Sequence, residues 1–423
     1  MWVNAMLESS YLPWRARQRI AHYLERTLYQ QRPDWYQRLF VGKQATAKAV
    51  TQGPDHHFFG YYDKSPWSED GQYLLAHCSQ IGFSQPQAGD AVTIGMVALV
   101  SQQFIPLAQS YAWNYQQGAM LQWLPNAPTQ LIFNDFVAGH FISRVIDIQG
   151  HAVAQYDTPV YALHPKLPLG YSLNFARLAR LRPDYGYCGS DDPFADQMSP
   201  SEDGVFLLDM TANHSRLIIS LAQLAQLNPL DSMSGAMHWV NHIQVSPKGD
   251  RIAFLHRWKI AGQAHQSRLY SAASDGSDLR CLLDTQMVSH YDWLNESQLM
   301  VWANTVDDTG CCYQLVDIYG QTQLAIDRSV FAGDGHCSFS PDRRWVLTDT
   351  YPDLYRKQEL YVFEVTKPKQ KQRLARLLSC DAARATIRCD LHPRWRQDGK
   401  QVCIDSSHDG TRQIYLLNLD QAG

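Results

Sequence analysis

The sequence predicts an all-β protein: a seven-bladed β-propeller of four-stranded antiparallel blades, with an N-terminal helical extension. Two observations predict this fold. A motif of strand, tight turn and strand recurs along most of the chain, and several copies continue into a third or fourth strand, as in residues 268–284 and 412–420. Repeats of four short strands at a period of roughly 30 to 60 residues are typical of propellers. We therefore expect a helical extension over residues 1–50 and the propeller over residues 51–423.

The clearest copy of the motif is the segment Val240–Trp258, VNHIQVSPKGDRIAFLHRW. Its first strand, His242–Val245, leads into a Ser-Pro-Lys-Gly-Asp turn, and its second strand covers Ile252–Leu255. A weaker copy covers residues 175–189 and is followed by the stretch DGVFLLDM. The large residue just before the turn aligns the stronger copies, at Trp67, Trp123, Val245, Trp293, Phe339 and Trp395. The weaker copy completes a count of seven blades.

Two segments depart from the strand pattern. Between residues 15 and 29, apolar residues at positions 20, 23, 24 and 28 follow helical spacing, and the remaining face is basic. We expect this helix to lie on the surface of its own domain, with docking to a partner or a membrane surface as the alternative. The Leu-rich stretch LIISLAQLAQLNPL predicts a helical insertion around residues 215–232.

Composition excludes several classes of protein. A net charge of −4 gives no basis for binding nucleic acid. The chain has no apolar run long enough for a membrane-spanning helix, so no integral membrane segment is expected. The nine cysteines contain no CxxC pair, and the N-terminus lacks the features of a secretory signal. Together these features predict a cytoplasmic protein with reduced thiols, and they leave the oligomeric state open.

Histidine recurs at one position of the repeat. Three residues before the aligned position, four consecutive copies carry His242, His290, His336 and His392, whereas the first copy carries Lys64 there. The first strand of each blade lines the central channel, so equivalent residues form a ring around the axis. Eleven or twelve residues after the aligned position, each of the stronger copies carries a polar, thiol or aromatic residue. The two strands run antiparallel, so both sets are expected at one mouth of the channel.

This mouth is the predicted functional site. Histidine at a strand start is often only a capping group, but three or four imidazoles at one mouth can also hold a divalent metal such as Mn or Zn. A loop rich in functional groups, HHFFGYYDK (residues 56–64), is a second source of contacts. The predicted substrate-binding residues are His57, Tyr61, Lys64, Asn134, Asp349, Arg394 and His408.

The blade motifs also resemble a known family. The stretches SPKGDRIAFLHRW, GHCSFSPDRRWVLTD and HPRWRQDGKQVCIDSSHDGTRQIYLL resemble TolB-type propeller blades. Their histidine-rich variant resembles the oligogalacturonate lyase family and, more distantly, the propeller-type ulvan lyases. The resemblance covers about residues 55–420.

The resemblance implies β-elimination on an acidic, uronate-containing oligosaccharide or polysaccharide. It implies a base for the C5 proton, a cation for the carboxylate and an acid for the leaving oxygen. His242 or another ring histidine suits the role of the base, Arg257 suits binding of the carboxylate, and Tyr351 suits the role of the acid. His256 is a further predicted catalytic residue. Oligogalacturonate lyases hold their metal with histidines and a glutamine. The resemblance implies His290, His336 and His392 as the metal ligands, and the sequence does not place the glutamine. The tyrosine expected of ulvan lyases is also not evident.

Two other functions stay open on the residues alone. The first is a non-catalytic propeller that binds a glycan or a protein partner, with surface-polysaccharide biosynthesis as one setting. The second is a hydrolase or an epimerase that uses the same histidines.

Overall fold

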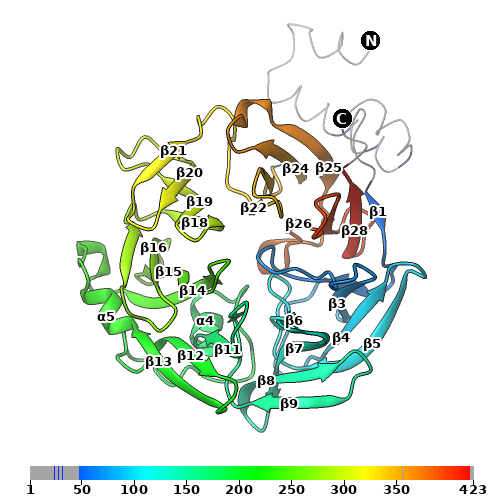
Figure 1. Ribbon diagram of the computed structural model, residues 1–423, viewed down its shortest axis with the longest axis horizontal. Helices are drawn as coiled ribbons and strands as arrows, with labels where there is room; N and C mark the ends of the chain where they lie inside the picture. The colour runs from blue at the N-terminus through cyan, green and yellow to red at the C-terminus, as the bar shows by residue number, and fades with distance from the viewer. Residues whose placement is uncertain (1–22, 24–26, 28–30, 32–46, 355, 420–423) are drawn as a thin grey trace, which may run out of the picture.

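The computed structural model describes residues 23, 27, 31, 47–354 and 356–419, and its strands form seven antiparallel sheets of four strands each. The sheets are arranged as blades around a central axis, as Figure 1 shows in a view along that axis. The predicted fold class is therefore confirmed. The N-terminal helix falls on residues that, apart from 23, 27 and 31, lie outside the described part of the chain. No described helix is long and apolar enough to cross a membrane.

Blades 1 to 6 are each built from four strands that follow one another in the chain. Blade 1 consists of β2 (His56–Phe58), β3 (Tyr73–Ser79), β4 (Val92–Ala98) and β5 (Gln103–Ser110). Blade 2 consists of β6 (Gln122–Leu124), β7 (Ala127–Val137), β8 (His140–Asp147) and β9 (Ala152–Tyr156). Blade 3 consists of β10 (Ala162–Leu163), β11 (Leu169–Ser172), β12 (Gly204–Asp209) and β13 (His214–Ser220).

The second half of the chain repeats this order. Blade 4 consists of β14 (Met237–Val245), β15 (Arg251–Lys259), β16 (Gln266–Ala273) and β17 (Arg280–Leu283). Blade 5 consists of β18 (Val288–Asn295), β19 (Gln298–Asn304), β20 (Cys311–Asp317) and β21 (Thr322–Ala325). Blade 6 consists of β22 (Ser338–Phe339), β23 (Trp345–Asp349), β24 (Lys357–Glu364) and β25 (Gln372–Leu378). Blade 7 begins with β26 (Arg394–Trp395), β27 (Gln401–Ser406) and β28 (Gln413–Asn418).

Short helices lie between the strands. Helix α4 (Phe175–Leu181) lies between β11 and β12, and helix α5 (Leu221–Gln226) follows β13. Single 3₁₀ turns occupy η2 (Asp231–Met233), η3 (Pro368–Gln370) and η4 (Ala385–Ile387). Helix α5 lies inside the predicted insertion, but the first residues of that range form β13.

The weak seventh repeat was placed wrongly. The segment that starts at Phe175 is helix α4, whose first turn is capped by the side chain of Asn174 accepting from the Arg177 amide. The inner strand of blade 3 is instead β10, which is followed by the turn His164-Pro165-Lys166. An amphipathic helical stretch was thus mistaken for a strand, although the number of blades is as predicted.

Apolar residues pack between neighbouring blades rather than around a single centre. Leu255 and Leu269 of blade 4, for example, form one buried cluster with Tyr291 and Leu299 of blade 5. The aligned residues of the repeat hold the predicted register, with Val245 opposite Ile252 and the other aligned residues paired in the same way. The start of each inner strand lies beside the end of the second strand. This pairing brings the two polar sets of the repeat to one face of the disc.

The inner strands are irregular at the histidine position. His242 and His392 have φ of 57° and 41°, and Met120, at the equivalent position of blade 2, has φ of 52°. The left-handed region is unfavourable for residues with a Cβ, and such residues cluster at functional sites. In blade 4 the pairing of β14 with β15 also shifts between Asn241 and Gln244. A bulge of this kind re-aims a side chain, here towards the axis.

The ring of blades is closed by the two ends of the chain. Strand β1 (Lys48–Ala49) pairs with β28 and forms the outer strand of blade 7. Near the axis, the Asp405 carboxylate accepts from the amides of Phe59 and Gly60, at 3.1 to 3.3 Å. Arg394 donates to Asp405 at 2.8 Å and to the Gly60 carbonyl at 2.8 Å. One buried ion pair thus joins blade 7 to blade 1.

We predict that Arg394→Met lowers the free energy of unfolding by about 3–5 kcal/mol, because it leaves the buried Asp405 carboxylate without its ion-pair partner. Chemical or thermal denaturation measures this change. Arg396→Met is the matched control, because Arg396 pairs with Asp398 near the surface and such pairs contribute about 0–1 kcal/mol. Equal effects of the two substitutions would contradict a closing role for Arg394.

Candidate functional site

Four histidines surround two tyrosines on the propeller axis. The rings of His242, His290, His336 and His392 have centroids 5.0 to 6.4 Å from that of Tyr61 and 5.2 to 6.5 Å from that of Tyr62. All six side chains are buried. Neighbouring histidines are also close, with centroids 4.2 Å apart for His290 and His336 and 4.3 Å apart for His336 and His392. We call this group the histidine ring.

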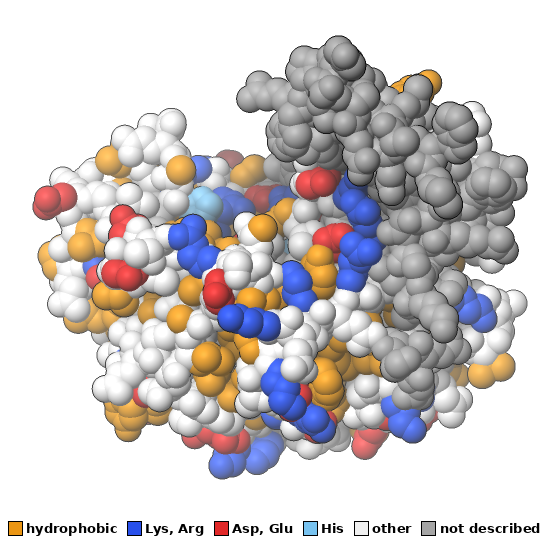
Figure 2. All heavy atoms as spheres, turned by 90° about the horizontal axis from the view of Figure 1, so that it is seen from above, with side chains coloured by type: hydrophobic (Ala, Val, Ile, Leu, Met, Phe, Trp, Pro, Cys, Tyr) orange, Lys and Arg blue, Asp and Glu red, His pale blue; other side chains and the backbone are white. Residues whose placement is uncertain are grey.

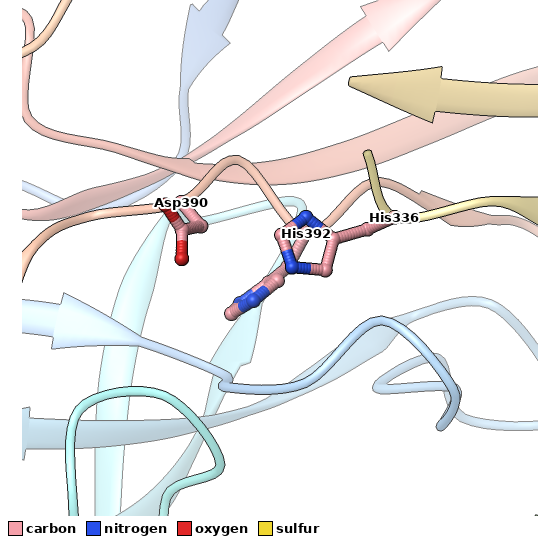
Figure 3. Close-up of side chains that lie close together, drawn as sticks. All are labelled: His336, Asp390 and His392. Atoms are coloured by element: carbon pink, nitrogen blue, oxygen red, sulfur yellow. The ribbon is translucent and has the colours of Figure 1, made fainter. Parts of the chain in front are cut away.

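One part of the histidine ring forms a potential metal site. His336, Asp390 and His392 each offer a ligand atom, and these atoms lie within 4.8 Å of one another (Figure 3). His336 Nε2, His392 Nε2 and Asp390 Oδ1 are all buried without a hydrogen-bond partner. Three unpaired polar atoms are costly to bury together. Two imidazoles and a carboxylate form a donor set that suits Mn or Zn, so the site fits a divalent metal.

A second carboxylate orients these donors. Asp349, at the end of β23, accepts from His336 Nδ1 at 2.9 and 3.0 Å and from the His336 amide at 2.7 Å. It also accepts from the His392 amide at 3.2 Å. Because Nδ1 of His336 donates, its Nε2 carries the lone pair that a metal needs. Burial raises the pKa of Asp349 to about 7 and lowers the pKa of His336 well below its usual value, so the imidazole of His336 stays neutral.

His290 differs from the other ring histidines. Its Nδ1 lies 3.0 Å from Asp334 Oδ1, and its Nε2 lies 3.5 Å from the Tyr351 hydroxyl. Donation from Nδ1 to Asp334 leaves Nε2 as the basic nitrogen. A carboxylate that fixes the tautomer of a histidine in this way is typical of a general base. Burial raises the pKa of Tyr351 well above its usual value, so its hydroxyl stays protonated.

His242 is already engaged within the protein. Its Nε2 lies 3.3 Å from the Tyr62 hydroxyl and 3.1 Å from the amide nitrogen of Gln244. Tyr62 and Gln244 both also donate to the Tyr291 carbonyl, at 2.9 Å each. The side-chain nitrogen of Gln244 can only donate, so Nε2 of His242 is an acceptor, and its lone pair already takes part in this hydrogen bond. His242 is therefore less suited to proton abstraction than His290.

Arginines line the same part of the channel. Arg257 Nη1 lies 3.2 Å from His265 Nε2, and Arg182 Nη1 lies 3.2 Å from the same atom. Burial, followed by these two arginines, lowers the pKa of His265 to about 3, so this imidazole stays neutral. Arg257 Nε is buried without a hydrogen-bond partner. Arg388 donates to the ligand candidate Asp390 at 2.7 Å. A free guanidinium edge can bind a carboxylate.

Several predicted site residues lie elsewhere. His57 contacts Gln413 at 3.2 Å, Asn134 bonds to Val160 and Tyr187, and His408 contacts Ser406 at 2.8 Å. These contacts, like the Arg394–Asp405 pair, hold blades and loops together. His256 points away from the histidine ring and stacks on His238, with 2.9 Å between His238 Nδ1 and His256 Nε2.

Lys64 lies at the other end of the channel. It pairs with Asp63 at 2.9 Å and its ammonium lies 5.0 Å from the centroid of the Tyr161 ring. Together with Gln244 and Asp292 it lines a polar cavity of about 250 Å³. The histidine ring and its two tyrosines thus separate Lys64 from the arginine-lined mouth. Of the predicted substrate-binding residues, Tyr61 and Asp349 are the ones that the fold brings to the histidine ring.

Sequence reasoning missed part of the site. Asp390 lies two residues before His392, and this Asp-x-His spacing was the available signal. Asp334 lies two residues before His336 in the same way. Tyr185, whose ring centroid lies 6.0 Å from that of Tyr61, and Arg182 come from the segment after α4. Nothing in the repeat pattern could place that segment at the channel mouth.

Two comparisons with known proteins found no match: no family model and no curated protein matches the sequence. Among solved structures, the chain is similar to an oligogalacturonate lyase in complex with manganese, with 16% identity, a TM-score of 0.61, and coverage of 88% of this chain and 93% of that chain. It is also similar to an oligogalacturonate lyase from Vibrio parahaemolyticus, with 13% identity, a TM-score of 0.60, and coverage of 89% and 94%. At these identities the likeness shows the fold alone, and at that level the predicted resemblance is confirmed.

The buried pair of His238 and His256 predicts acid sensitivity. Burial lowers the pKa of His238 to about 4 and that of His256 well below its usual value of 6.5. As the pH falls, these two histidines become protonated in the unfolded chain before they do so in the folded protein. Their contribution to the free energy of unfolding is therefore fully present above about pH 6.5, and it falls by about 1.4 kcal/mol per pH unit for each histidine as the pH approaches 4. We expect the melting temperature to drop between pH 7 and pH 5, and less steeply in His256→Gln.

The control for this measurement is His151→Gln, because the side chain of His151 is 78% exposed and its removal should leave the slope unchanged. If His256→Gln melts with the same pH dependence as the unsubstituted protein, the pair does not resist protonation.

Proposed function

We propose that this protein is a metal-assisted lyase that cleaves an acidic, uronate-containing oligosaccharide by β-elimination. One observation supports it most: three buried, unpartnered donors of a metal site lie directly beside an aspartate-paired histidine. A structure of similar fold is an oligogalacturonate lyase in complex with manganese, which supports the same reaction class and the same kind of metal. The substrate is then an acidic sugar chain with a carboxylate at C6 of the residue that is cleaved.

His336, Asp390 and His392 would hold the metal in this proposal. His290, which the sequence predicts in the same set, lies outside the group of three whose ligand atoms converge, and its Nε2 faces the Tyr351 hydroxyl. A divalent ion supplies positive charge that stabilises the enolate formed from the substrate carboxylate. Asp349 keeps His336 in the tautomer that can bind such an ion.

His290 would act as the base. Its Nε2 takes the proton from C5 of the uronate, and Asp334 stabilises the imidazolium that forms. The electron pair of the C5–H bond moves to form the C4–C5 double bond as the C4–O bond to the leaving sugar breaks. Tyr351, 3.5 Å from His290 Nε2, would give its proton to the leaving oxygen. Its raised pKa keeps that proton in place until the bond breaks.

Arg257 would bind the substrate carboxylate. Its Nε has no partner within the described part of the protein, although the side chain is 7% exposed. His265 contacts one of its terminal nitrogens, Nη1, and Arg182 contacts the same nitrogen of His265. Neutralising the carboxylate makes the C5 proton more acidic, which is the main requirement of this elimination.

A non-catalytic propeller that binds a glycan or a protein is the second candidate. One observation favours it: the four ring histidines are at most 3% exposed, so a sugar chain reaches them only if the arginine-lined mouth opens. A structural histidine ring would need no such opening.

We predict that His290→Ala lowers kcat/KM for oligogalacturonates by about 10²- to 10⁴-fold, because it removes the proton acceptor. Arg257→Lys should lower it as well, because lysine cannot reproduce the forked contact to a carboxylate. The measurement is the ultraviolet absorbance of the unsaturated uronate product. His214→Ala, a substitution of an exposed histidine on β13, is the control and should retain full activity.

The outcomes separate the two candidates. Absorbance that rises equally fast in the His290→Ala protein would reject His290 as the base. Binding of oligogalacturonates without any unsaturated product would reject the lyase and leave the binding propeller.

A further inference from the structure

A cavity between blades 2 and 3 lies apart from the histidine ring. It has a volume of about 680 Å³, and its lining comes from β8, β12 and the segments 157–159, 172–176 and 190–194, among others. Strands β8 and β12 lie in the lower part of Figure 1. None of the four ring histidines lines the cavity, and neither do their two tyrosines. Its volume lies within the range of small-molecule sites, roughly 300 to 1,000 Å³, so it can hold a ligand of its own.

Four phenylalanines give this cavity aromatic walls. Phe175, at the start of α4, is buried, whereas the other three are half-buried, namely Phe141, Phe194 and Phe206. Phe141 and Phe175 pack against the buried Tyr187 ring, with centroids 5.5 and 4.4 Å from it, so this part of the wall is fixed in place. The half-buried rings keep part of their surface uncovered. The face of such a ring attracts apolar groups and also cations, because its quadrupole is negative there.

The charged residues of the lining are acidic. Asp157 and Asp191 are exposed at the cavity, and neither carboxylate has a hydrogen-bond or ion-pair partner within the described part of the chain. The third acidic residue, Asp203, is buried, and its charge is offset by Arg177, which lies 4.0 Å from it. Among the described residues that line the cavity, none is lysine or arginine, and the one histidine is the exposed His140. Two negative charges therefore stay uncompensated beside the phenyl rings.

The opposite edge of the disc has a different character. Figure 2 views the edge where β24 and β25 lie and shows basic side chains there with acidic ones among them. Arg344 and Glu364, for example, form an ion pair at 3.3 Å. Between blades 2 and 3, carboxylates stand beside phenyl rings without basic neighbours in the lining. Because carboxylates and ring faces both attract positive charge, this cavity favours a cation and disfavours an anion.

We propose that this cavity is a binding site for a small organic cation, an ammonium or guanidinium compound that also carries an apolar group. The charged end would lie near Asp157 and Asp191, and the apolar part would pack against the half-buried rings. A bare metal ion would leave those rings uncovered, and a neutral apolar molecule would leave the carboxylates unpaired. The acidic sugar chain of the proposed function carries the wrong charge for this cavity, so the inference does not rest on that function.

The test uses two probes of nearly the same shape, phenethylammonium and the neutral phenethyl alcohol, and measures their binding to the full-length protein by calorimetry. We expect the cation to bind about tenfold more tightly than the alcohol. The double variant Asp157→Asn, Asp191→Asn should lose this preference, because it removes both uncompensated charges and keeps the shape of two exposed side chains. Phe194→Leu keeps an apolar wall but removes a ring face, and it should lower the preference by about two- to fivefold.

The matched control is Asp196→Asn. Asp196 is an exposed residue close to Asp191 in the sequence, and it does not line the cavity. Its substitution removes a neighbouring surface charge and should leave the affinities of both probes unchanged.

Three results would overturn the inference. The first is equal affinity for the cation and the alcohol, or no binding of either probe. The second is a double variant that prefers the cation as strongly as the unsubstituted protein does. The third is an equal loss of preference in Asp196→Asn, which would show that the general surface charge attracts the cation and not the cavity.

Discussion

The carboxylate of Asp349 holds the site together. It lies at the end of the second strand of blade 6, and it binds the imidazole and amide of His336 from its own blade and the amide of His392 from blade 7. Two blades are thus fixed relative to each other at the point where their inner strands begin. Without this acceptor, the free nitrogens of the two histidines would have no reason to face one another. The candidate metal site formed by His336, Asp390 and His392 depends on that alignment.

The propeller provides this alignment at a cost in local backbone energy. Left-handed residues at the histidine position and a bulge in β14 take the inner strands out of regular pairing, and such conformations cost about 1–3 kcal/mol each. The apolar clusters between blades and the buried Arg394–Asp405 ion pair keep the ring of blades closed around these irregular strands. Burial also strengthens the electrostatic interactions that the polar groups near the axis can form. In a medium of low polarity, an unpaired nitrogen binds a cation more strongly, and a guanidinium holds a carboxylate more strongly, than in water.

Much of this architecture could be predicted from the sequence. The repeat register gave the blades, and counting back from the aligned residue gave the four histidines, because identical positions in a propeller meet at the axis. His57, Asn134, Arg394 and His408, which the sequence predicts as substrate-binding residues, form their hydrogen bonds away from the histidine ring. Their side chains are polar and lie near predicted strand ends or loops, but each one forms hydrogen bonds that connect strands or loops. The sequence repeat shows where a side chain lies along a strand, but it does not show which neighbouring residue is its hydrogen-bond partner.

The remaining parts come from loops without a repeat. Asp390 precedes the inner strand of blade 7, and Arg182 and Tyr185 follow helix α4 in an insertion that only blade 3 carries. Tertiary contacts such as that between Arg388 and Tyr185, at 3.1 Å, bring these loops to the mouth. Contacts between loops follow no repeating pattern, so a single sequence does not predict them. The weak copy at residues 175–189 is wrongly predicted for the same reason, because the apolar spacing of α4 also fits a strand.

The most direct test of the central claim is metal binding by protein first stripped with a chelator and then titrated separately with Mn²⁺ and Zn²⁺. We expect about one ion per chain, lost in Asp390→Asn and in His336→Ala because each removes one of three converging donors. His242→Gln is the matched control, since His242 belongs to the histidine ring but lies outside that trio and should leave the ion bound. Failure of the unsubstituted protein to bind either ion, or equal binding by Asp390→Asn, would contradict the account.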